Sequence, residues 1–478
     1  MNVVTYHYFA YLPTHPPLQR TYKITQSTLA ESLDEQTARQ IYNLNLTASA
    51  PYTVNYSRTG RQLLLAGRTG HVAILDALTR NLTMELQLTS PPNSIRAATF
   101  LHNSSLFALA EKSRVFIYDD KGAEVHMLHD HQEPLALQYL PYHWLLASVG
   151  RTGYLKYTDT STGTKVCEIR TKLGACGVMQ ANPYNSCMHL GHGTGVVTMY
   201  SPAVSTPLVK MLCHKGPITA MAIDLTGKYM VTAGSDKQVK VWDIRTYKEV
   251  HSYYSHHAVT DLDLSQTDML CVGGAGNVNV WKDALRVKQQ SPYMSERIGQ
   301  GGCSVQSVKF RPFEDVLGVG SSEGFSSLVI PGSGEAGVDT YESNMFQDKK
   351  QRQESEVRSL LDKISPDLIG LDPNALGQVE RDRKVVVKEQ RELQTEARDR
   401  RKEEDKGKKV AKKARGRNKI NKKLARKHKN IVDEGKIKLE EKKRDAKEAQ
   451  GDFETGVSVE EKKRRKGVED GGALARFF

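Results

Sequence analysis

Short runs in which hydrophobic and polar residues alternate fill the chain between residues 51 and 330. In Leu63–Leu75 and in Tyr229–Trp242, two such runs are separated by a turn of small residues that includes glycine. A two-residue period is typical of half-buried strands, and glycine or aspartate between two strands is typical of a hairpin. The pattern therefore predicts an all-β region built from many short strands.

A large residue closes one of these runs about every 40 positions. The steps between successive copies are 43, 40, 42, 42 and 39 residues, and the copies are Leu75, Tyr118, Thr158, Tyr200, Trp242 and Trp281. A period near 40 with one Trp-Asp pair, here Trp242-Asp243, is the signature of WD-type propeller blades. Seven units of about 40 residues fit between 51 and 330, and they begin near Pro51, Asn93, Glu133, Gly174, Lys215, His257 and Cys303.

The seventh unit lacks a fourth strand, because Phe325–Ile330 leads directly into Pro331-Gly-Ser-Gly-Glu335. A propeller with an unpaired outer strand would expose an edge. We therefore expect Ile41–Leu46 to supply the missing strand. Residues 21–40 favour short helices, and Thr28–Glu31 resembles a capping box.

The period changes after the propeller. Hydrophobic residues fall on one face at helical spacing up to Ser365-Pro366, which ends the predicted helix, and these residues are Phe346, Val357, Leu360, Leu361 and Ile364. We expect this face to dock on the propeller or on a neighbouring protein. A short apolar arm follows at Leu368–Pro373. The predicted organisation is an N-terminal segment (1–50), a propeller (51–330), a post-propeller segment (331–375) and a charged tail (376–478).

The positive charge of the chain is concentrated in the tail. Residues 341–478 hold 39 Lys and Arg against 28 Asp and Glu, which is +11 of the total +13. No aromatic residue occurs between Phe346 and Phe453. Such a composition cannot bury enough apolar area to fold alone, so we expect the tail to be disordered, or helical when bound.

One block of the tail, residues 406–429, contains no acidic residue. Its basic residues are Lys406, Lys408, Lys409, Lys412, Lys413, Arg415, Arg417, Lys419, Lys422, Lys423, Arg426, Lys427 and Lys429. A solvated helix face mixes both signs of charge, so the block favours contact with RNA phosphates. An import signal alone is the other interpretation, and Lys462–Lys466 also resembles one.

Three groups of residues could be mistaken for sites of chemistry. His214, Thr232, Asp236 and Trp242 fit the structural hydrogen-bonded chain of a WD blade; only this unit has the full set, so we expect the other blades to rely on packing. Gly332–Gly337 fits G-x-G-x-x-G but lacks the following helix of a dinucleotide site. Cys187, His189 and His192 lack a second ligand pair. We predict no enzyme activity, cofactor, metal or small-molecule substrate.

The chain carries six cysteines and no C-x-x-C pair, and most of them lie inside predicted strands. Such thiols usually act as small buried hydrophobic groups. The N-terminus does not resemble a signal peptide, and no apolar run reaches the ~18 residues of a membrane helix. We expect a soluble protein of a reducing compartment that has no membrane partner.

Several segments resemble one eukaryotic family. They include Leu140–His143, Met188–His192, Val280–Leu285, Tyr341–Arg352 and Glu356–Ile364 with Leu371-Asp-Pro373. The resemblance is to the WD-repeat proteins of the small-subunit processome, the U3 small nucleolar RNA-associated protein seven or WD repeat-containing protein forty-six family. It implies a seven-bladed propeller in the nucleolus. It also implies a scaffold role in pre-ribosomal RNA processing and 18S rRNA maturation, with the U3 particle, pre-ribosomal RNA and other processome proteins as partners.

A different nuclear WD-type adaptor is the alternative function. A ligase substrate receptor or a chromatin adaptor would have the same fold, because many unrelated proteins share it. The post-propeller resemblance argues against this alternative.

Overall fold

The computed structural model of the protein describes residues 20–88, 95–299, 302–338, 340, 343–373, 395 and 438–445. The chain divides into two units, Met1–Gln378 and Val379–Phe478. In the second unit, residues 438–445 are helical. The first unit holds all the strands that the structure describes.

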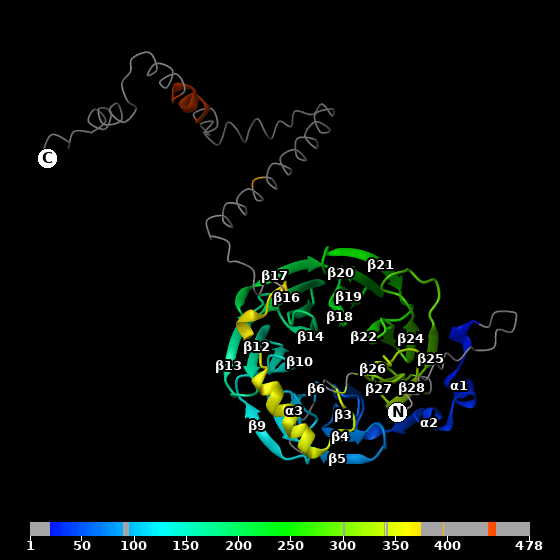
Figure 1. Cartoon of the computed structure of the whole chain (residues 1–478). Helices are drawn as coiled ribbons and strands as arrows, with labels where there is room; N and C mark the ends of the chain where they lie inside the picture. The colour runs from blue at the N-terminus through cyan, green and yellow to red at the C-terminus, as the bar shows by residue number, and fades with distance from the viewer. Residues whose placement is uncertain are drawn as a thin grey trace. The chain divides into compact units, whose positions relative to one another are not determined.

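Within the described residues, 28 strands form seven four-stranded antiparallel sheets, which are arranged as blades around a ring (Figure 1). Blade one contains β2 (Tyr52–Tyr56), β3 (Gln62–Gly67), β4 (His71–Asp76) and β5 (Leu82–Gln87). Blade two contains β6 (Ala97–Phe100), β7 (Leu106–Ala110), β8 (Val115–Asp119) and β9 (Glu124–Leu128). Blade three contains β10 (Pro134–Leu140), β11 (Leu145–Gly150), β12 (Tyr154–Asp159) and β13 (Lys165–Arg170). Blade four contains β14 (Cys176–Ala181), β15 (Met188–His192), β16 (Val196–Ser201) and β17 (Val204–Leu212).

The remaining blades follow the same order from the ring axis outwards. Blade five contains β18 (Ile218–Ile223), β19 (Tyr229–Gly234), β20 (Gln238–Asp243) and β21 (Lys248–Tyr254). Blade six contains β22 (Val259–Leu264), β23 (Leu270–Gly274), β24 (Asn277–Trp281) and β25 (Met294–Arg297). Blade seven contains β26 (Val305–Phe310), β27 (Val316–Ser321), β28 (Gly324–Val329) and β1 (Tyr42–Asn45). The predicted seven-bladed propeller is confirmed.

The N-terminal strand β1 closes the ring. It pairs antiparallel with β28, with Leu44 opposite Phe325, and the amide of Leu46 donates to the carbonyl of Glu323 at 2.8 Å. Tyr42 and Leu44 pack against the cluster between blades seven and one. The strand expected at Ile41–Leu46 is therefore present and covers the outer edge of blade seven.

The N-terminal helices extend this cover. Helix α1 (Gln26–Ser32) places the buried side-chain amide of Gln26 against β28, where it exchanges two hydrogen bonds of 2.9 and 3.0 Å with the backbone of Val329. The expected capping box at Thr28–Glu31 is wrong, because Thr25 is the N-cap and its side chain accepts from the amide of Thr28. Thr28 lies inside the helix, and α2 (Glu35–Ala38) leads to β1.

The hydrophobic core is divided among the interfaces between neighbouring blades. Seven clusters of buried side chains occur in the described part of the chain, and each joins residues of two adjacent blades. The cysteines follow this pattern, since five of the six are buried and Cys167 is half-buried. Burial raises the pKa of the thiols of Cys176, Cys187 and Cys213 to about 12, so they act as apolar side chains.

Polar groups also tie neighbouring blades together. Asp263 of β22 accepts from the amide of Phe310 at 2.7 Å and from the Lys309 ammonium at 2.8 Å, which joins blade six to blade seven. The buried guanidinium of Arg311 donates from Nε to the carbonyl of Gly60 at 2.7 Å, which joins blade seven to blade one. Because buried charges require partners, these contacts fix the blades at the point where the ring closes.

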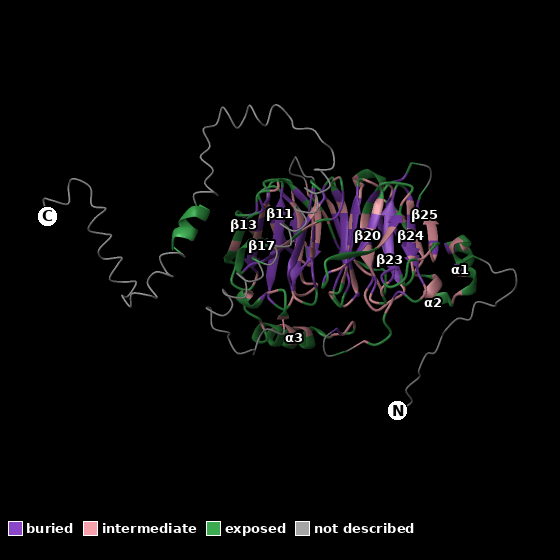
Figure 2. Ribbon diagram, turned by 90° about the horizontal axis from the view of Figure 1, so that it is seen from above, coloured by how far each residue is buried: buried purple, intermediate pink, exposed green. Residues whose placement is uncertain are grey.

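The ring has two faces. In each blade the first and third connections lie at one end of the strands, and the second connection, with the link to the next blade, lies at the other end. Residues 331–373, which we call the strap, cross the first of these faces, so we name it the strapped face (Figure 2). The opposite face is called the open face. Its turns are tight: a Cβ added to Gly195 (φ 79°) would lie 2.1 Å from the carbonyl oxygen of His214.

We expect Leu44→Pro to loosen the closure of the ring. Since Leu46 donates to Glu323, the alternation of an antiparallel ladder directs the amide of Leu44 to the same neighbour. Proline removes this donor and leaves a carbonyl unpaired, at a cost of about 1–3 kcal/mol. Hydrogen exchange of the β28 amides measures the effect. Asn43→Pro, on the free edge, should have little effect, and equal exchange in Leu44→Pro and Leu44→Ala would contradict the role of this donor.

Candidate interaction surfaces

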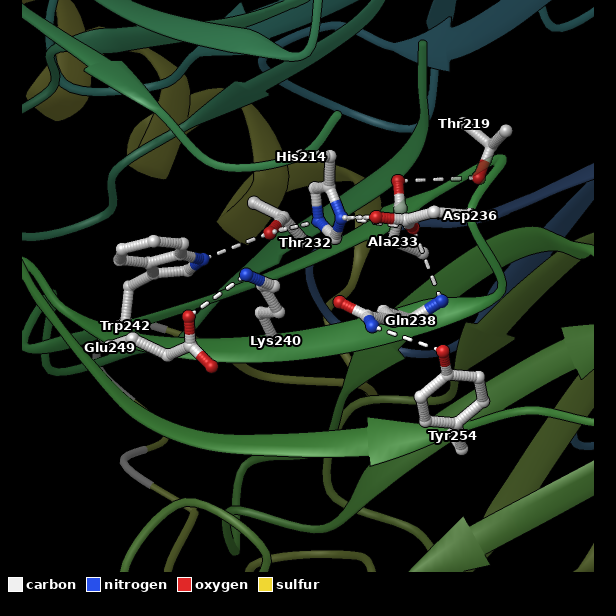
Figure 3. A network of polar contacts seen from close by, with 10 residues as sticks. All are labelled: His214, Thr219, Thr232, Ala233, Asp236, Gln238, Lys240, Trp242, Glu249 and Tyr254. Carbon is white, nitrogen blue, oxygen red and sulfur yellow. Dashed lines mark hydrogen bonds and ion pairs between the residues drawn. The ribbon is translucent and has the colours of Figure 1, made fainter. Parts of the chain in front are cut away.

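A chain of polar side chains lies inside blade five (Figure 3). The indole nitrogen of Trp242 donates to the hydroxyl of Thr232 at 3.0 Å. That hydroxyl lies 2.9 Å from Nε2 of His214, and Nδ1 of His214 lies 3.1 Å from Asp236. Burial opposes ionisation of Asp236, but the bond from His214 keeps the pKa of that carboxyl below its usual value. Each hydrogen-bond donor of these four side chains has an acceptor within the same set, so the buried polar groups are all hydrogen-bonded.

A related group lies inside blade three. His131 is buried, and its two ring nitrogens contact the hydroxyls of Ser148 and Thr158. In strand register, Ser148 and Thr158 occupy the positions of Thr232 and Trp242. Burial, assisted by the nearby Lys156 ammonium, lowers the pKa of His131 to about 4. The expectation that all blades except blade five rely on packing is therefore wrong, because a smaller histidine-centred set also serves blade three.

The residues Cys187, His189 and His192 do not converge on a metal. His189 contacts the carbonyl of Cys187 at 3.3 Å, and Nε2 of His192 contacts the hydroxyl of Thr198 at 2.7 Å. Burial lowers the pKa of both imidazoles to about 4. Among the described residues, no group of three or more metal-ligating side chains occurs. The two histidines belong to the core of blade four.

The glycine-rich turn Gly332–Gly337 already holds an anion from its own chain. The amides of Gly332 and Gly334 donate to the two carboxylate oxygens of Asp315 at 3.0 and 2.7 Å. Thr267 of blade six donates to the carbonyl of Gly332 at 2.8 Å. Amides that would face a phosphate in a dinucleotide site are thus bound to Asp315, which starts the strap in a fixed position.

The strap then crosses blades one, two and three. The carbonyl of Met345 accepts from Arg61 of blade one at 2.9 Å. Helix α3 (Lys349–Leu361) follows, and Glu356 accepts from His102 at 2.8 Å and from Asn103 at 3.2 Å, both in blade two. The indole of Trp144 in blade three stacks on His102 and donates to the carbonyl of Ser359 at 3.1 Å.

The end of α3 is held by charge and by backbone hydrogen bonds. The Lys363 ammonium contacts the carboxylate of Asp159 and donates to Ser161 at 2.8 Å. Although burial disfavours the charged form, the contacts with Lys363 and Ser161 keep the pKa of Asp159 below its usual value. The amide of Ile364 donates to the carbonyl of Tyr142 at 3.0 Å. These contacts immobilise the strap on blade three.

The last described part of the strap inserts an apolar anchor. Ile369, which is 4% exposed, packs into the cluster between blades three and four, and its carbonyl accepts from Ser201 at 2.5 Å. Asn185 donates to the carbonyl of Leu371 at 3.2 Å. The apolar arm expected at Leu368–Pro373 thus contributes one buried side chain, and the residues around it are held by polar contacts.

The predicted helix differs from α3 in its limits and in its orientation. It begins at Lys349 and ends at Leu361, so Phe346 precedes it and Ile364 follows it. The apolar face does not pack on the propeller: Phe346 is 68% exposed, Val357 57% and Leu361 82%. Because Glu356 and the carbonyl of Ser359 find partners on blades two and three, the helix turns its polar side to the ring. Docking of the apolar face on the propeller is therefore a wrong prediction.

Several hydrophobic residues of the strap are exposed. We call this set the strap patch, and it contains Phe346, Val357, Leu360, Leu361 and Ile364. On the same face, Tyr142, Tyr184 and Leu225 are also exposed. They are among the residues that line a central cavity of about 870 Å³. Clustered apolar groups on a surface are characteristic of protein-binding sites.

The basic block of the tail, Lys406–Lys429, lies outside the described residues. Its role therefore remains a prediction. None of the helices in the described part of the chain has the length and apolar character needed to cross a bilayer.

Two family models match the chain. The model of the WD domain, G-beta repeat, matches residues 205–243, which hold the polar chain of blade five. The model of the BING4CT (NUC141) domain matches residues 292–372, which comprise β25, the strands β26 to β28 of blade seven and nearly the whole strap. The second match covers the part of the molecule that distinguishes it from a plain propeller.

Full-length relatives extend these matches. The U3 small nucleolar RNA-associated protein 7 of Saccharomyces cerevisiae is 43% identical over 387 residues, which cover 78% of this chain and 69% of the relative. The chain belongs to the family of U3 small nucleolar RNA-associated protein 7. The WD repeat-containing protein 46 of Homo sapiens is 42% identical over 364 residues. That alignment covers 75% of this chain and 59% of the human protein, so the chain spans less than two thirds of this family member.

We expect Thr232→Val to destabilise blade five. Valine has the shape of threonine but lacks the hydroxyl, so Trp242 and His214 would each lose a buried partner. An unsatisfied buried group costs about 1–3 kcal/mol. Denaturant unfolding should show this loss, and Thr219→Val on the neighbouring strand, where the hydroxyl is half-buried, is the matched control. Equal midpoints for the two variants would argue against a stabilising polar chain.

We expect Ile369→Ala to release the end of the strap, while Leu361→Ala leaves it in place. Truncation of a buried isoleucine costs about 2–5 kcal/mol, whereas an exposed substitution changes stability by about 0.5 kcal/mol or less. Limited proteolysis between residues 360 and 373 reports the difference. If the two variants were cleaved at the same rate, Ile369 would not be the anchor.

Proposed function

We propose that the protein is a non-enzymatic scaffold of the small-subunit processome that acts in pre-ribosomal RNA processing and 18S rRNA maturation in the nucleolus. The observation that carries this proposal is the match over residues 292–372 together with relatives named for association with U3 small nucleolar RNA. A propeller alone would not support it, because the same fold serves many functions. The matched segment is the one that shapes the strapped face.

The geometry favours a scaffold over an enzyme. The imidazoles of His131 and His189 and the thiol of Cys176 are buried in blade interiors, where burial makes the imidazoles neutral and the thiol protonated at neutral pH. The glycine-rich turn binds Asp315 in place of a phosphate. A rigid ring with several loop-covered surfaces is suited to holding partners in fixed relative positions.

The strap patch is the surface we assign to a processome protein. It exposes Phe346, Val357, Leu360, Leu361 and Ile364 on a segment whose backbone is fixed by contacts to several blades. Because the strap is already ordered, a partner that covers these side chains loses little conformational entropy from this chain. Aromatic and aliphatic side chains on a rigid support are typical anchors of such interfaces.

The basic block from Lys406 to Lys429 is the segment we assign to pre-ribosomal RNA or to the RNA of the U3 particle. Thirteen cations without an acidic neighbour suit phosphate neutralisation. The block contains no aromatic residue for base stacking, so we expect affinity with little sequence selectivity. If about 6–10 phosphates are neutralised, affinity should fall about 10³–10⁵-fold between 50 and 200 mM salt.

Replacement of the thirteen Lys and Arg residues of 406–429 by Gln should weaken RNA association and nucleolar retention. The reason is that the substitutions remove the charge and preserve the length of the tail. Crosslinking in cells, followed by sequencing of the bound RNA, should recover pre-ribosomal RNA with the unaltered chain and much less with this tail-neutral variant. Replacement by Gln of the Lys and Arg residues of 380–403, a segment of the same length that also contains acidic residues, is the control.

Two results would contradict parts of this proposal. Undiminished, salt-sensitive RNA binding by the tail-neutral variant would remove the tail from the RNA contact. Recovery of ligase or histone partners in place of pre-ribosomal RNA by the unaltered chain would favour the adaptor function.

A further inference from the structure

The open face lies opposite to the strap (Figure 2), and its turns and inter-blade links contain basic residues. Among the described residues, six exposed cations lie in its turns and inter-blade links along blades one to five. They are Arg68, Lys112, Arg151, Lys172, Lys215 and Lys237. Each lies in a short connection between strands of fixed position, so the arc they form is set by the ring. None of the six makes an ion pair with a residue that the structure describes.

Acidic residues neutralise little of this arc. The exposed carboxylates in the described loops of the open face are Asp130 and Glu133, both in the link between blades two and three. Asp130 lies 3.7 Å from the Lys165 ammonium of β13. Asp236 bonds to His214, and Glu111 is half-buried beside the hydroxyl of Tyr118. Over most of the arc, the positive charges therefore face solvent with no exposed carboxylate in the described loops nearby to neutralise them.

The apolar content of the two faces differs, and this difference separates the classes of partner. The exposed large hydrophobic side chains in the described loops belong to the strapped face and the strap, among them Tyr142, Tyr184, Leu225 and Leu361. The described loops of the open face contain none, and Leu212 and Tyr254, the last residues of β17 and β21, are the exposed large hydrophobic side chains at its border among the described residues. Protein interfaces have apolar cores that are depleted of charge, whereas nucleic-acid contacts rest on cations directed at phosphates. The open face has the second character.

One aromatic ring stands at the border of this face. Tyr254, the last residue of β21, is 77% exposed, and its hydroxyl accepts from the side-chain amide of Gln238 at 3.3 Å (Figure 3). The amide of its neighbour Ser255 donates to the carbonyl of Lys237, so the backbones of Tyr254 and Lys237, one of the six cations, lie near each other. An exposed ring beside a cation can stack on an unpaired base. This favours single-stranded RNA over a duplex, whose bases are already stacked.

We propose that the open face of the propeller binds the backbone of single-stranded RNA through Arg68, Lys112, Arg151, Lys172, Lys215 and Lys237. The inference rests on the proposed function for its choice of RNA, but it assigns a contact separate from the basic tail. The ring fixes the spacing of these cations, so this face supplies a preorganised path along the phosphates. The tail and the open face together give the chain two RNA contacts, and the strap patch is left for protein.

The test uses the full-length chain with the tail-neutral substitutions as background. Four open-face lysines are replaced by Gln in one variant: Lys112, Lys172, Lys215 and Lys237. Four exposed lysines of the strapped face are replaced in the matched control: Lys121, Lys228, Lys282 and Lys288. The measurement is the salt dependence, between 50 and 200 mM, of binding to a single-stranded RNA oligonucleotide of mixed sequence. Melting temperatures establish that both variants are folded.

On a single strand, each phosphate contact contributes about 0.7 to the magnitude of the slope of log affinity against log salt concentration. We therefore expect the four substitutions of the open-face variant to reduce that magnitude by up to about 3. The strapped-face control should keep the slope of the background protein. Tyr254→Ala should weaken binding several-fold without a change in slope, because a stacked ring carries no charge, and Tyr254→Phe should retain the affinity.

Three outcomes would overturn the inference. If the open-face variant and its control bound RNA alike, or if the tail-neutral background did not bind RNA, the open face would not be an RNA contact, while the proposed function would stand on the unaltered chain. If the open-face variant lost binding to polyglutamate but kept RNA binding, the partner would be an acidic protein. Absence of RNA binding by the unaltered chain would reject the proposed function itself.

Discussion

Closure of the ring by the N-terminal strand is the interaction on which the rest of this structure depends. Without β1, the last sheet would end at β28 and present an open edge, because the chain leaves that strand directly for the strap. Pairing of Leu44 with Phe325, the bonds from Gln26 to Val329 and the buried bond from Arg311 to Gly60 act at this junction. A closed ring holds the loops between its strands in fixed positions. The side chains that each face exposes therefore depend on this closure.

The strap illustrates how such a ring can organise a surface. Its contacts run from Asp315 and Thr267 at one end to Ser201 and Asn185 at the other, so residues far apart in sequence hold one segment. Most of these contacts are hydrogen bonds or ion pairs, and Ile369 is the buried apolar anchor. Since the polar side of α3 satisfies the loops beneath it, the hydrophobic side chains are left exposed. The hydrophobic surface that a partner can contact is thus determined by the hydrogen bonds that the loops of the ring form with the polar side of α3.

Residues with the chemistry of active sites have structural roles here. His214, His131 and His192 bond hydroxyl groups inside the blades, and Asp315 occupies the glycine-rich turn. Strands packed on both sides leave no water for their polar groups, so each group needs a partner from the chain. Six exposed cations of the described propeller lie in the turns and inter-blade links of the open face.

By itself the sequence determined the propeller, the closing strand and the polar chain of blade five, because strand period, repeat length and hydrogen-bonding residue types are local properties. It also singled out the post-propeller segment through its family resemblance. Only the tertiary structure decided which way α3 faces, since helical spacing defines an apolar stripe but not whether Glu356 and Ser359 will find partners on the ring. The set around His131 escaped detection because Ser148 and Thr158 replace the expected threonine and tryptophan. The open-face arc was equally hidden: its six cations are scattered singly between Arg68 and Lys237, and only the folding of five blades onto one ring brings them to the same face.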